Sequence, residues 1–180
     1  MKLMVASDIH GSAYFCEKLV SRFKTENADM LLLLGDILYH GPRNALPYGY
    51  APDKTAKMLN DIKENILCVR GNCDSEVDQM VLDFPIMADY AVLYADNKIF
   101  FATHGHKYNI DNLPPLKNGT VFLSGHTHIP SCKSEKGYVF INPGSVSIPK
   151  GLSQNQYMII DKGSCISKDT DGNILDSNYF

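Results

Sequence analysis

The sequence predicts an α/β protein of one domain, residues 1–180, in which two β-sheets pack as a sandwich with helices outside. In the first half of the chain, short apolar runs alternate with amphipathic stretches, which is the pattern of β-α-β units with parallel strands. From residue 87 onward, short apolar runs follow one another with turn residues between them, which indicates mainly strands. A chain of 180 residues matches the usual size of one domain and can bury a substantial core.

The first half is predicted to alternate buried strands with helices. Leu19 and Phe23 fall on one stripe of the first predicted helix, and its charged residues fall on the opposite face. Asp53 or Thr55 is expected to cap the second helix. The predicted strands are 3–6, 30–34 and 66–69, the predicted helices are 13–24, 56–64 and 75–82, and a long loop is expected at 39–52.

The second half is predicted to consist of strands joined by tight turns. Asp96-Asn97 separates two short apolar runs and is typical of a hairpin turn. Lys136-Gly137 and Lys162-Gly163 indicate two further turns. The predicted strands are 92–94, 99–102, 121–123, 138–141, 157–160 and 164–167, with a final edge strand at 174–177.

Composition excludes several classes of protein. Apolar residues make up 44% of the chain and charged residues 21%, the net charge is −3, and no basic block indicates nucleic-acid binding. Five cysteines without CxxC spacing argue against a disulfide framework or a structural zinc site and favour a reducing cytoplasm. The N-terminus lacks a signal-peptide pattern, and the longest strongly apolar run, 30–34, is too short to cross a bilayer. We therefore expect a cytoplasmic protein.

Seven polar residues with metal-ligand chemistry follow apolar runs, and most of them lie beside a glycine. In an extended chain, residues two apart point to the same side, so Asp8 and His10 project together from the end of the first strand. A glycine directly before three of the seven is expected to let the backbone turn sharply there. Open α/β sheets bind ligands beyond the carboxyl ends of their strands, where these side chains are expected to gather. The seven are Asp8, His10, Asp36, Asn72, His104, His126 and His128.

The chemistry of this set predicts two metal ions. Four imidazoles favour Mn²⁺, Fe²⁺, Co²⁺ or Zn²⁺ over Ca²⁺ or Mg²⁺. Seven ligands exceed the needs of one tetrahedral ion, and one shared carboxylate suits two ions roughly 3.5–4 Å apart. Because two divalent ions outweigh the two aspartates, the site is expected to be positive and to attract a phosphate ester. Such ions lower the pKa of bound water toward neutrality and so provide a hydroxide nucleophile.

Five motifs of the chain resemble those of calcineurin-like metallophosphoesterases. They are Asp8-Ile9-His10, Gly35-Asp36, Gly71-Asn72-Cys73-Asp74, Thr103-His104-Gly105-His106 and Gly125-His126-Thr127-His128. Two further segments resemble the small bacterial YfcE phosphodiesterases, namely His40-Gly41-Pro42-Arg43-Asn44-Ala45-Leu46-Pro47 and Asn142-Pro143-Gly144-Ser145-Val146-Ser147. The motifs occur in order at fitting intervals, and the likeness extends through nearly the whole chain.

The resemblance implies the metallophosphoesterase fold, a two-sheet sandwich with flanking helices in α/β/β/α layers. It also implies a dinuclear site that is often loaded with Mn²⁺, with Fe, Co, Ni or Zn as alternatives. The implied division of ligands is Asp8, His10 and His128 on one ion, Asn72, His104 and His126 on the other, and Asp36 as the bridge.

Three further residues are candidates for catalysis and one for substrate binding. Cys73 stands where many relatives carry a histidine thought to protonate the leaving group, and a thiol is a poorer acid for an alkoxide near neutral pH. This departure predicts slow turnover or a preference for good leaving groups such as aryl esters, unless His106 acts as the acid. Asp74 is expected to orient a ligand imidazole through its free nitrogen. Arg43 is the candidate donor to a phosphate oxygen.

Three of these candidates also have a plainer interpretation. Cys73 has the size of a small buried side chain, His106 can bond a neighbouring carbonyl group, and an arginine in a loop such as Arg43 is often solvated. The three tyrosines of the 39–52 loop are expected to form either an aromatic rim for an aryl or nucleoside group or an interface patch. They are Tyr39, Tyr48 and Tyr50.

These observations predict a phosphodiesterase that uses two metal ions and a metal-bound hydroxide to hydrolyse a small phosphoester substrate. A phosphomonoesterase or protein phosphatase of the same fold is the first alternative, because the loops around the site decide between them. A binding scaffold that kept the fold and lost the chemistry is the second, and the presence of all seven ligands argues against it. No membrane or specific nucleic-acid partner is expected, and a homo-oligomer is compatible with the sequence.

Overall fold

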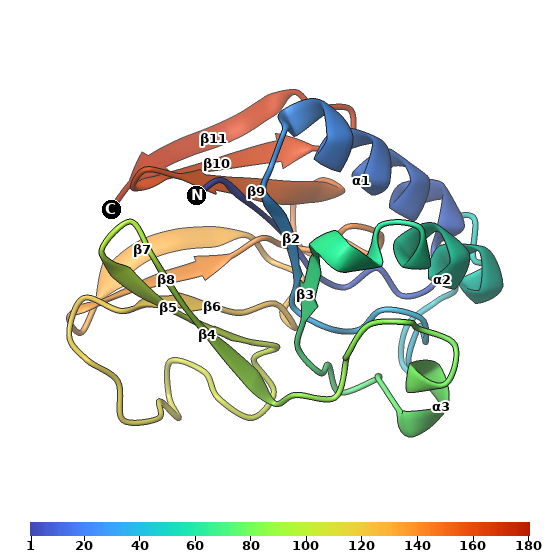
Figure 1. Ribbon diagram of the computed structural model, residues 1–180, viewed down its shortest axis with the longest axis horizontal. Coiled ribbons are helices and arrows are strands. Elements are labelled where there is room, and N and C mark those ends of the chain that lie inside the picture. The colour runs from blue at the N-terminus through green and yellow to red at the C-terminus, as the bar shows by residue number, and fades with distance from the viewer.

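The computed structural model describes residues 1–180, and its strands form two mixed sheets packed face to face (Figure 1). One sheet contains β1 (Leu3–Ala6), β2 (Met30–Leu33), β3 (Ile66–Cys68), β9 (Gln156–Asp161), β10 (Ser164–Asp169) and β11 (Ile174–Tyr179). Its strand order is β11-β10-β9-β1-β2-β3, in which β1, β2 and β3 are parallel. The β-α-β units expected from the first half of the sequence are therefore confirmed.

The second sheet has five strands. They are β4 (Tyr90–Ala95), β5 (Lys98–Thr103), β6 (Val121–Leu123), β7 (Ser131–Glu135) and β8 (Tyr138–Asn142), in the order β4-β5-β6-β8-β7. The three central strands are parallel to one another, and the two edge strands run antiparallel to their neighbours. The hairpin between β4 and β5 turns at Asp96 and Asn97, both with positive φ, as the sequence predicted.

Three α-helices and one short 3-10 turn (Lys63–Asn65) accompany the sheets: α1 (Ala13–Glu26), α2 (Pro52–Asn60) and α3 (Glu76–Gln79). The first helix runs two residues beyond its predicted end and stops at Asn27, which has left-handed backbone. The second begins four residues earlier than predicted, because the fixed φ of Pro52 suits the first turn of a helix. The expectation that Asp53 or Thr55 caps it is wrong, since both lie inside the helix.

Alternation along β1 divides the core into two layers. Met4 and Ala6 face α1 and α2, which cover the outer face of the six-stranded sheet (Figure 1). Leu3 and Val5 point the other way, into the apolar layer between the two sheets. A two-sheet sandwich with a helical layer on one side follows from this arrangement.

The outer face of the five-stranded sheet is covered without a helix. Phe101, Phe122 and Phe140 form an aromatic cluster there, and apolar side chains of the irregular segment 104–120 pack against it. The fourth layer of the sandwich is therefore a loop in this chain.

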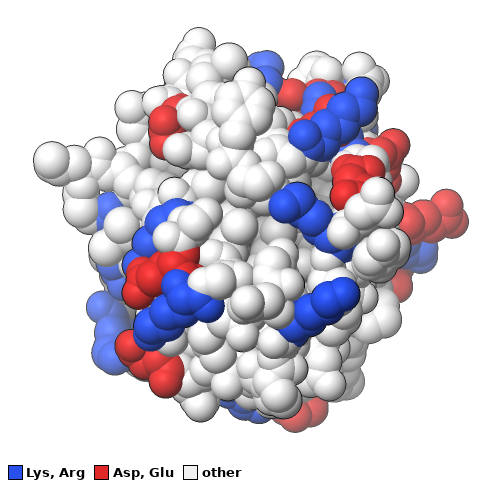
Figure 2. Space-filling view, turned by 90° about the vertical axis from the view of Figure 1, so that its left-hand side faces the viewer, with Lys and Arg blue, Asp and Glu red and all other residues white.

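One strand was not predicted, and its sequence explains why. β7 is an edge strand of mostly polar, exposed residues, Ser-Cys-Lys-Ser-Glu, so it carries no apolar run. Both chain ends lie on the left-hand side of Figure 1. On that face, Figure 2 shows acidic and basic side chains interspersed with one another. No helix combines the length and the hydrophobicity that a bilayer crossing requires.

Candidate metal centre

The carboxyl ends of the parallel strands of both sheets meet at one edge of the sandwich, and the seven predicted ligands lie there. Contacts between the sheets fix this edge. The backbone N–H of His126 donates to Asp8 Oδ2 over 3.1 Å, and that of Val146 donates to the carbonyl oxygen of Ser7 over 3.0 Å. Asp8 and His10 follow β1, Asp36 follows β2, Asn72 follows β3, His104 follows β5, and His126 and His128 follow β6.

Five of the seven candidate ligands have left-handed backbone conformations. They are Asp8, His10, Asp36, His126 and His128, with φ between 48° and 66°. A residue other than glycine adopts this conformation at a cost in free energy, and such residues cluster at functional sites. The rest of the fold therefore holds these five side chains in place against a local backbone preference.

Three of the histidines are oriented by backbone carbonyl groups. The Nδ1 atoms of His10, His104 and His128 lie 2.8, 2.6 and 2.6 Å from the carbonyl oxygens of Tyr39, Leu34 and Ile148. A carbonyl oxygen only accepts, so each Nδ1 must carry the proton and donate. In a neutral imidazole the Nε2 atom then presents a lone pair, which is the form that binds a metal ion.

The first ligand group consists of Asp8, His10 and His128. The Oδ1 atom of Asp8 lies 3.7 Å from Nε2 of His10 and 3.2 Å from Nε2 of His128, and the two Nε2 atoms are 3.4 Å apart. Asp8 Oδ1 is buried and accepts no hydrogen bond. Burial opposes ionisation of Asp8, but the neighbouring imidazoles outweigh it and lower the pKa of the carboxyl group. Three lone pairs thus face one another around a space that suits a cation.

The second ligand group consists of Asn72, His104 and His126, and Asp36 lies between the groups. His104 Nε2 is 3.0 Å from Asn72 Oδ1 and 3.2 Å from His126 Nδ1. His126 therefore faces this group through Nδ1, whereas His104 faces it through Nε2. Asp36 Oδ2 lies 3.5 Å from His104 Nε2 and 3.6 Å from His10 Nε2. A carboxylate within reach of both groups has the position of a shared ligand.

The donor set fits two divalent ions. Ligand atoms of Asp8, His10 and His128, and likewise those of Asp8, Asp36 and His104, lie within 4.8 Å of one another. Carboxylate oxygens, one amide oxygen and imidazole nitrogens together match the preferences of borderline metals. Two groups that share one carboxylate have the layout of a dinuclear site.

Two of the glycines beside the ligands allow close packing rather than sharp turns. A Cβ atom on Gly71 would lie 2.1 Å from Asp36 Oδ1, and one on Gly125 would lie 2.0 Å from Ser7 Oγ. Neither glycine has a positive φ, whereas Gly35 does, at +94°. The expectation that a glycine makes the sharp turn before each of these ligands is therefore correct only for Gly35. At Gly125 the ligand residue that follows, His126, adopts the left-handed conformation itself, whereas neither Gly71 nor Asn72 has a positive φ.

Asp74 supports the backbone around Asp36 instead of an imidazole. Its carboxylate accepts hydrogen bonds from the N–H groups of Asp36, Ile37 and Gly71 over 2.8, 2.8 and 2.7 Å. The expectation that it orients a ligand histidine is wrong, since the Nδ1 atoms of His10, His104 and His128 bond to backbone carbonyl groups instead. Burial raises the pKa of Asp74 above its usual value, and the three amide donors oppose that shift.

The Asn142–Ser147 segment, which the sequence marked only by its resemblance to the YfcE phosphodiesterases, fixes the turn after β1. Ser145 Oγ and Ser147 Oγ both donate to the carbonyl oxygen of Asp8, over 2.9 and 3.1 Å. Asn142 Nδ2 donates to the carbonyl oxygen of Gly125 over 2.7 Å. These side chains hold the two loops that carry the first ligand group.

Cys73 lies at the edge of the second ligand group. Its backbone N–H donates to Asp36 Oδ1 over 2.8 Å, and its Sγ accepts from the Asn72 amide over 3.3 Å. Burial, followed by the charge of Asp36, raises the pKa of the thiol to about 12, so the group stays protonated near neutral pH. The side chain lines the cavity in front of the ligands.

His106 lies beside His104 and His126, with its ring centre 5.4 and 6.2 Å from theirs. Its Nδ1 is buried and has no hydrogen-bond partner, so the alternative of a histidine bonded through Nδ1 to a neighbouring carbonyl group does not hold. Burial, followed by the nearby imidazole of His104, lowers the pKa of His106. It does not line the cavity in front of the ligands.

A polar cavity of about 500 Å³ opens in front of the ligands. Arg43, the predicted substrate-binding residue, lines it together with Asn44 from the 39–52 loop. Thr127 and Lys150 line the same cavity. Lys150 was not predicted, because the only signal was its place three residues after the Asn142–Ser147 segment.

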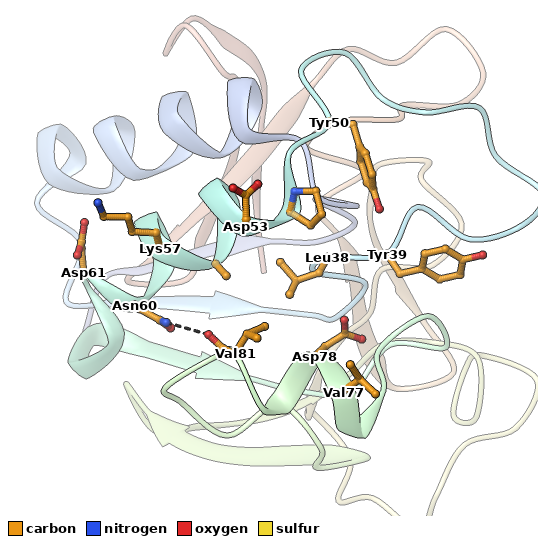
Figure 3. A pocket seen from close by; sticks show the side chains of 12 residues that line it. Leu38, Tyr39, Tyr50, Asp53, Lys57, Asn60, Asp61, Val77, Asp78 and Val81 are labelled. Atoms are coloured by element: carbon orange, nitrogen blue, oxygen red, sulfur yellow. Dashed lines mark hydrogen bonds between the residues drawn. The ribbon is translucent and has the colours of Figure 1, made fainter.

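The three loop tyrosines do not form one rim. Tyr39 and Tyr50 line a second, more apolar cavity of about 640 Å³ between α2 and α3 (Figure 3), together with Asp53 and Asp78. Tyr48 packs edge-on against Tyr14, with ring centres 4.8 Å apart. The expected aromatic rim for a substrate group is therefore wrong for Tyr48, and the other two tyrosines lie outside the cavity that contains the ligands.

In sequence, this chain resembles a family and two proteins that are described as phosphoesterases or phosphodiesterases. The family model described as "Calcineurin-like phosphoesterase superfamily domain" matches residues 1–164. The chain is 50% identical over 162 residues to Phosphodiesterase YfcE of Escherichia coli K12, which covers 89% of this chain and 88% of that protein. It is 25% identical over 152 residues to Phosphodiesterase MJ0936 of Methanocaldococcus jannaschii, covering 80% and 83% of the two chains.

A solved structure has nearly the same fold. The structure of YfcE, described as a phosphoesterase from E. coli, superposes with a TM-score of 0.96 at 44% sequence identity. The superposition covers 99% of each chain. The likeness therefore extends to every element that carries a candidate ligand.

Proposed function

The chain belongs to the calcineurin-like phosphoesterase superfamily, and we propose that it is a phosphodiesterase that uses two divalent metal ions. The observation that carries this proposal is the pair of facing ligand groups joined by Asp36. Asp8 Oδ1 and the Nε2 atoms of His10 and His128 face one another in a buried space without a hydrogen-bond donor. A divalent cation in this space would satisfy all three lone pairs at once.

The division of ligands in this proposal follows the contacts. Asp8, His10 and His128 would hold one ion and Asn72, His104 and His126 would hold the other, while Asp36 would serve both. The two distances of about 3.5 Å from Asp36 Oδ2 to the two groups support its shared role. Bound divalent ions acidify water and stabilise the charge that develops on a phosphoryl group.

The protein's own contribution is to hold this site rigid and to orient the ester. Asp74 holds the backbone of Asp36, and Ser145 and Ser147 hold that of Asp8, so the ligands need little reorganisation. Arg43 lines the cavity and can donate two N–H groups to a phosphoryl oxygen. The deep placement of Asp8 and His10 excludes bulk water from the first ligand group.

We propose Mn²⁺ as the metal, with Fe, Co, Ni and Zn as alternatives, because a mixed oxygen and imidazole donor set accepts each of them. We further propose a reducing, cytoplasmic setting, which the five free cysteines support. The substrate in this proposal is a small phosphoester, and neither a membrane nor a specific nucleic acid takes part.

The test of the proposal is metal-dependent release of nitrophenol. Protein stripped with chelator and reloaded with Mn²⁺ should hydrolyse bis(p-nitrophenyl) phosphate, and excess chelator should lower the rate by at least about a thousandfold, as expected when the source of the nucleophile is removed. Faster hydrolysis of p-nitrophenyl phosphate would favour the phosphomonoesterase alternative. Absence of turnover with every metal would favour the binding scaffold.

Replacement of Cys73 by histidine tests whether the site lacks a leaving-group acid. The thiol is at the cavity wall beside Asn72, so an imidazole there would face a bound ester. General acid catalysis contributes roughly 10²–10⁴-fold, and we expect at least about tenfold faster turnover of alkyl or phenyl diesters. Nitrophenyl esters, whose leaving group needs no proton, should change by less than about threefold.

The matched variant is Cys73→Ala, which removes the thiol without adding an acid. It should show no gain on any ester. If Cys73→His behaves like Cys73→Ala, the site does not lack a leaving-group acid at position 73. His106→Gln then becomes the decisive variant for the remaining candidate acid.

A further inference from the structure

Two unpaired cations line the cavity in front of the ligand groups. Neither the Arg43 guanidinium nor the Lys150 ammonium group forms an ion pair with a carboxylate, and neither side chain donates a hydrogen bond within the protein. By contrast, Lys18, Lys63 and Lys168 are each paired with an acidic side chain. The two cations at the cavity are therefore available to a ligand.

The backbones of both residues are tied to the site. The backbone N–H of Lys150 donates to the carbonyl oxygen of His128 over 3.2 Å, and Ser153 Oγ donates to the carbonyl oxygen of Lys150 over 2.6 Å. On the other side, the side-chain amide of Asn44 closes the loop around Arg43 by donating to the carbonyl oxygen of His40 over 2.8 Å. Each cation thus projects from an anchored backbone.

The lining of the cavity offers no large apolar side chain to a substituent of the substrate. It contains no phenylalanine, tyrosine, leucine, isoleucine, valine or methionine side chain. The apolar cavity that contains Tyr39 and Tyr50 is separate from it. A volume of about 500 Å³ is nevertheless more than a phosphoryl group alone requires, so room remains for a second polar group.

Charge balance points to an anionic second group. Two divalent ions bring four positive charges, and Asp8, Asp36 and one hydroxide return three. Arg43 and Lys150 raise the sum by two, and Asp74 beneath the site lowers it by one. A simple diester carries one negative charge and leaves this sum positive, whereas a second anionic group with a single negative charge brings it to zero and a doubly charged phosphate makes it slightly negative.

We infer that the preferred substrate is a small polar phosphodiester that carries a second anionic group, such as a phosphate or carboxylate, which Arg43 and Lys150 bind. This inference rests on the proposed function and names the substrate class of the same site. It adds Lys150 as a residue that determines specificity. The remaining alternative is that both side chains are solvated and make no contact with substrate.

The test uses three p-nitrophenyl phosphodiesters that differ in their second substituent: propyl, 3-phosphonopropyl, and 3-phosphonopropyl as its neutral dimethyl ester. The Mn²⁺-loaded protein should have a kcat/KM at least about tenfold higher for the phosphono ester than for either neutral-tail ester. Lys150→Gln and Arg43→Gln should each lower that ratio by at least about threefold, and Lys150→Arg should retain most of it. High salt should lower the ratio as well.

The matched control is Lys162→Gln, at the far end of β9 from the site, which should leave the ratio unchanged. Calorimetric titration of the metal-loaded protein with propane-1,3-bisphosphonate and with propylphosphonate gives a readout without turnover. The bisphosphonate should bind at least about tenfold more tightly, and Lys150→Gln should remove most of that difference.

The two proposals fail in different ways. If all three esters are hydrolysed at similar kcat/KM, and Lys150→Gln changes neither this ratio nor bisphosphonate binding, the second-anion inference is overturned and the phosphodiesterase stands. If no ester is hydrolysed with any metal, the proposed function fails, and the inference about substrate fails with it.

Discussion

Replacement of Asp36 by asparagine is expected to lower phosphodiesterase turnover by about a thousandfold or more, or about 4 kcal/mol in the barrier. Asp36 Oδ2 is within 3.6 Å of His10 Nε2 and within 3.5 Å of His104 Nε2, so it is the carboxylate that links the two ligand groups. Loss of its charge weakens the binding of both metal ions at once. The measurements are kcat on bis(p-nitrophenyl) phosphate with Mn²⁺ and the metal content of the purified variant.

The metal-free fold should survive this substitution. The asparagine keeps one oxygen, which can accept from the Cys73 N–H as Asp36 Oδ1 does over 2.8 Å. Its amide nitrogen can donate to the imidazole lone pairs that otherwise face a metal ion. In chelator, the variant should therefore melt at or above the temperature of the wild type. Asp111→Asn, at an exposed acid in the 104–120 segment, is the control and should keep full activity.

A wild-type rate for the Asp36→Asn protein would show that the two groups do not share this carboxylate. Loss of the folded state in chelator would instead show that the charge of Asp36 is needed for folding. Both results differ from the expected loss of activity in a stable protein.

The candidate ligands were accessible to sequence reasoning because each follows an apolar run. In a parallel sheet, the residue after a buried strand lies at the carboxyl edge, whatever the rest of the fold does. This argument placed Asp8, Asp36 and Asn72 near one another. For His104 and His126 it predicted only that each follows a strand, because nothing in the sequence marked β5, β6 and β8 as parallel strands.

The supporting contacts were not accessible in the same way. Asp74 accepts hydrogen bonds from the backbone amides of Ile37 and Gly71, and Ser145 donates to the carbonyl oxygen of Asp8, 137 residues away. Residue type predicts that an aspartate accepts hydrogen bonds, but not which amides come within reach. The erroneous expectation for Asp74 arose from this limit.

Backbone conformation was also beyond sequence reasoning here. The glycines were expected to make the sharp turns, yet His126 and His128 adopt the left-handed conformation themselves. Tertiary contacts impose that conformation, such as the hydrogen bond from the His126 N–H to Asp8 Oδ2. Local propensity yields to such contacts where a site must be built.

Replacement of Asp74 by alanine is expected to lower the free energy of unfolding by about 3–5 kcal/mol in the absence of metal. Three N–H groups, from Asp36, Ile37 and Gly71, would each lose their acceptor in a region where Asp74 itself is only 2% exposed. Each unsatisfied buried donor costs roughly 1–3 kcal/mol, and relief from burying a charge offsets part of the sum. Urea denaturation in chelator measures the change.

The conservative variant separates the contacts from the charge. In Asp74→Asn, one oxygen can still accept from Asp36 and Gly71, but the amide nitrogen would face the Ile37 N–H, so an intermediate loss is expected. Asp83→Asn, at an exposed ion pair with Lys63, should change stability by less than about 1 kcal/mol. If Asp74→Ala is as stable as Asp83→Asn, water or a local shift replaces the carboxylate. The backbone of Asp36 would then be held by the two sheets alone, and the Mn²⁺ affinity of that variant would remain that of the wild type.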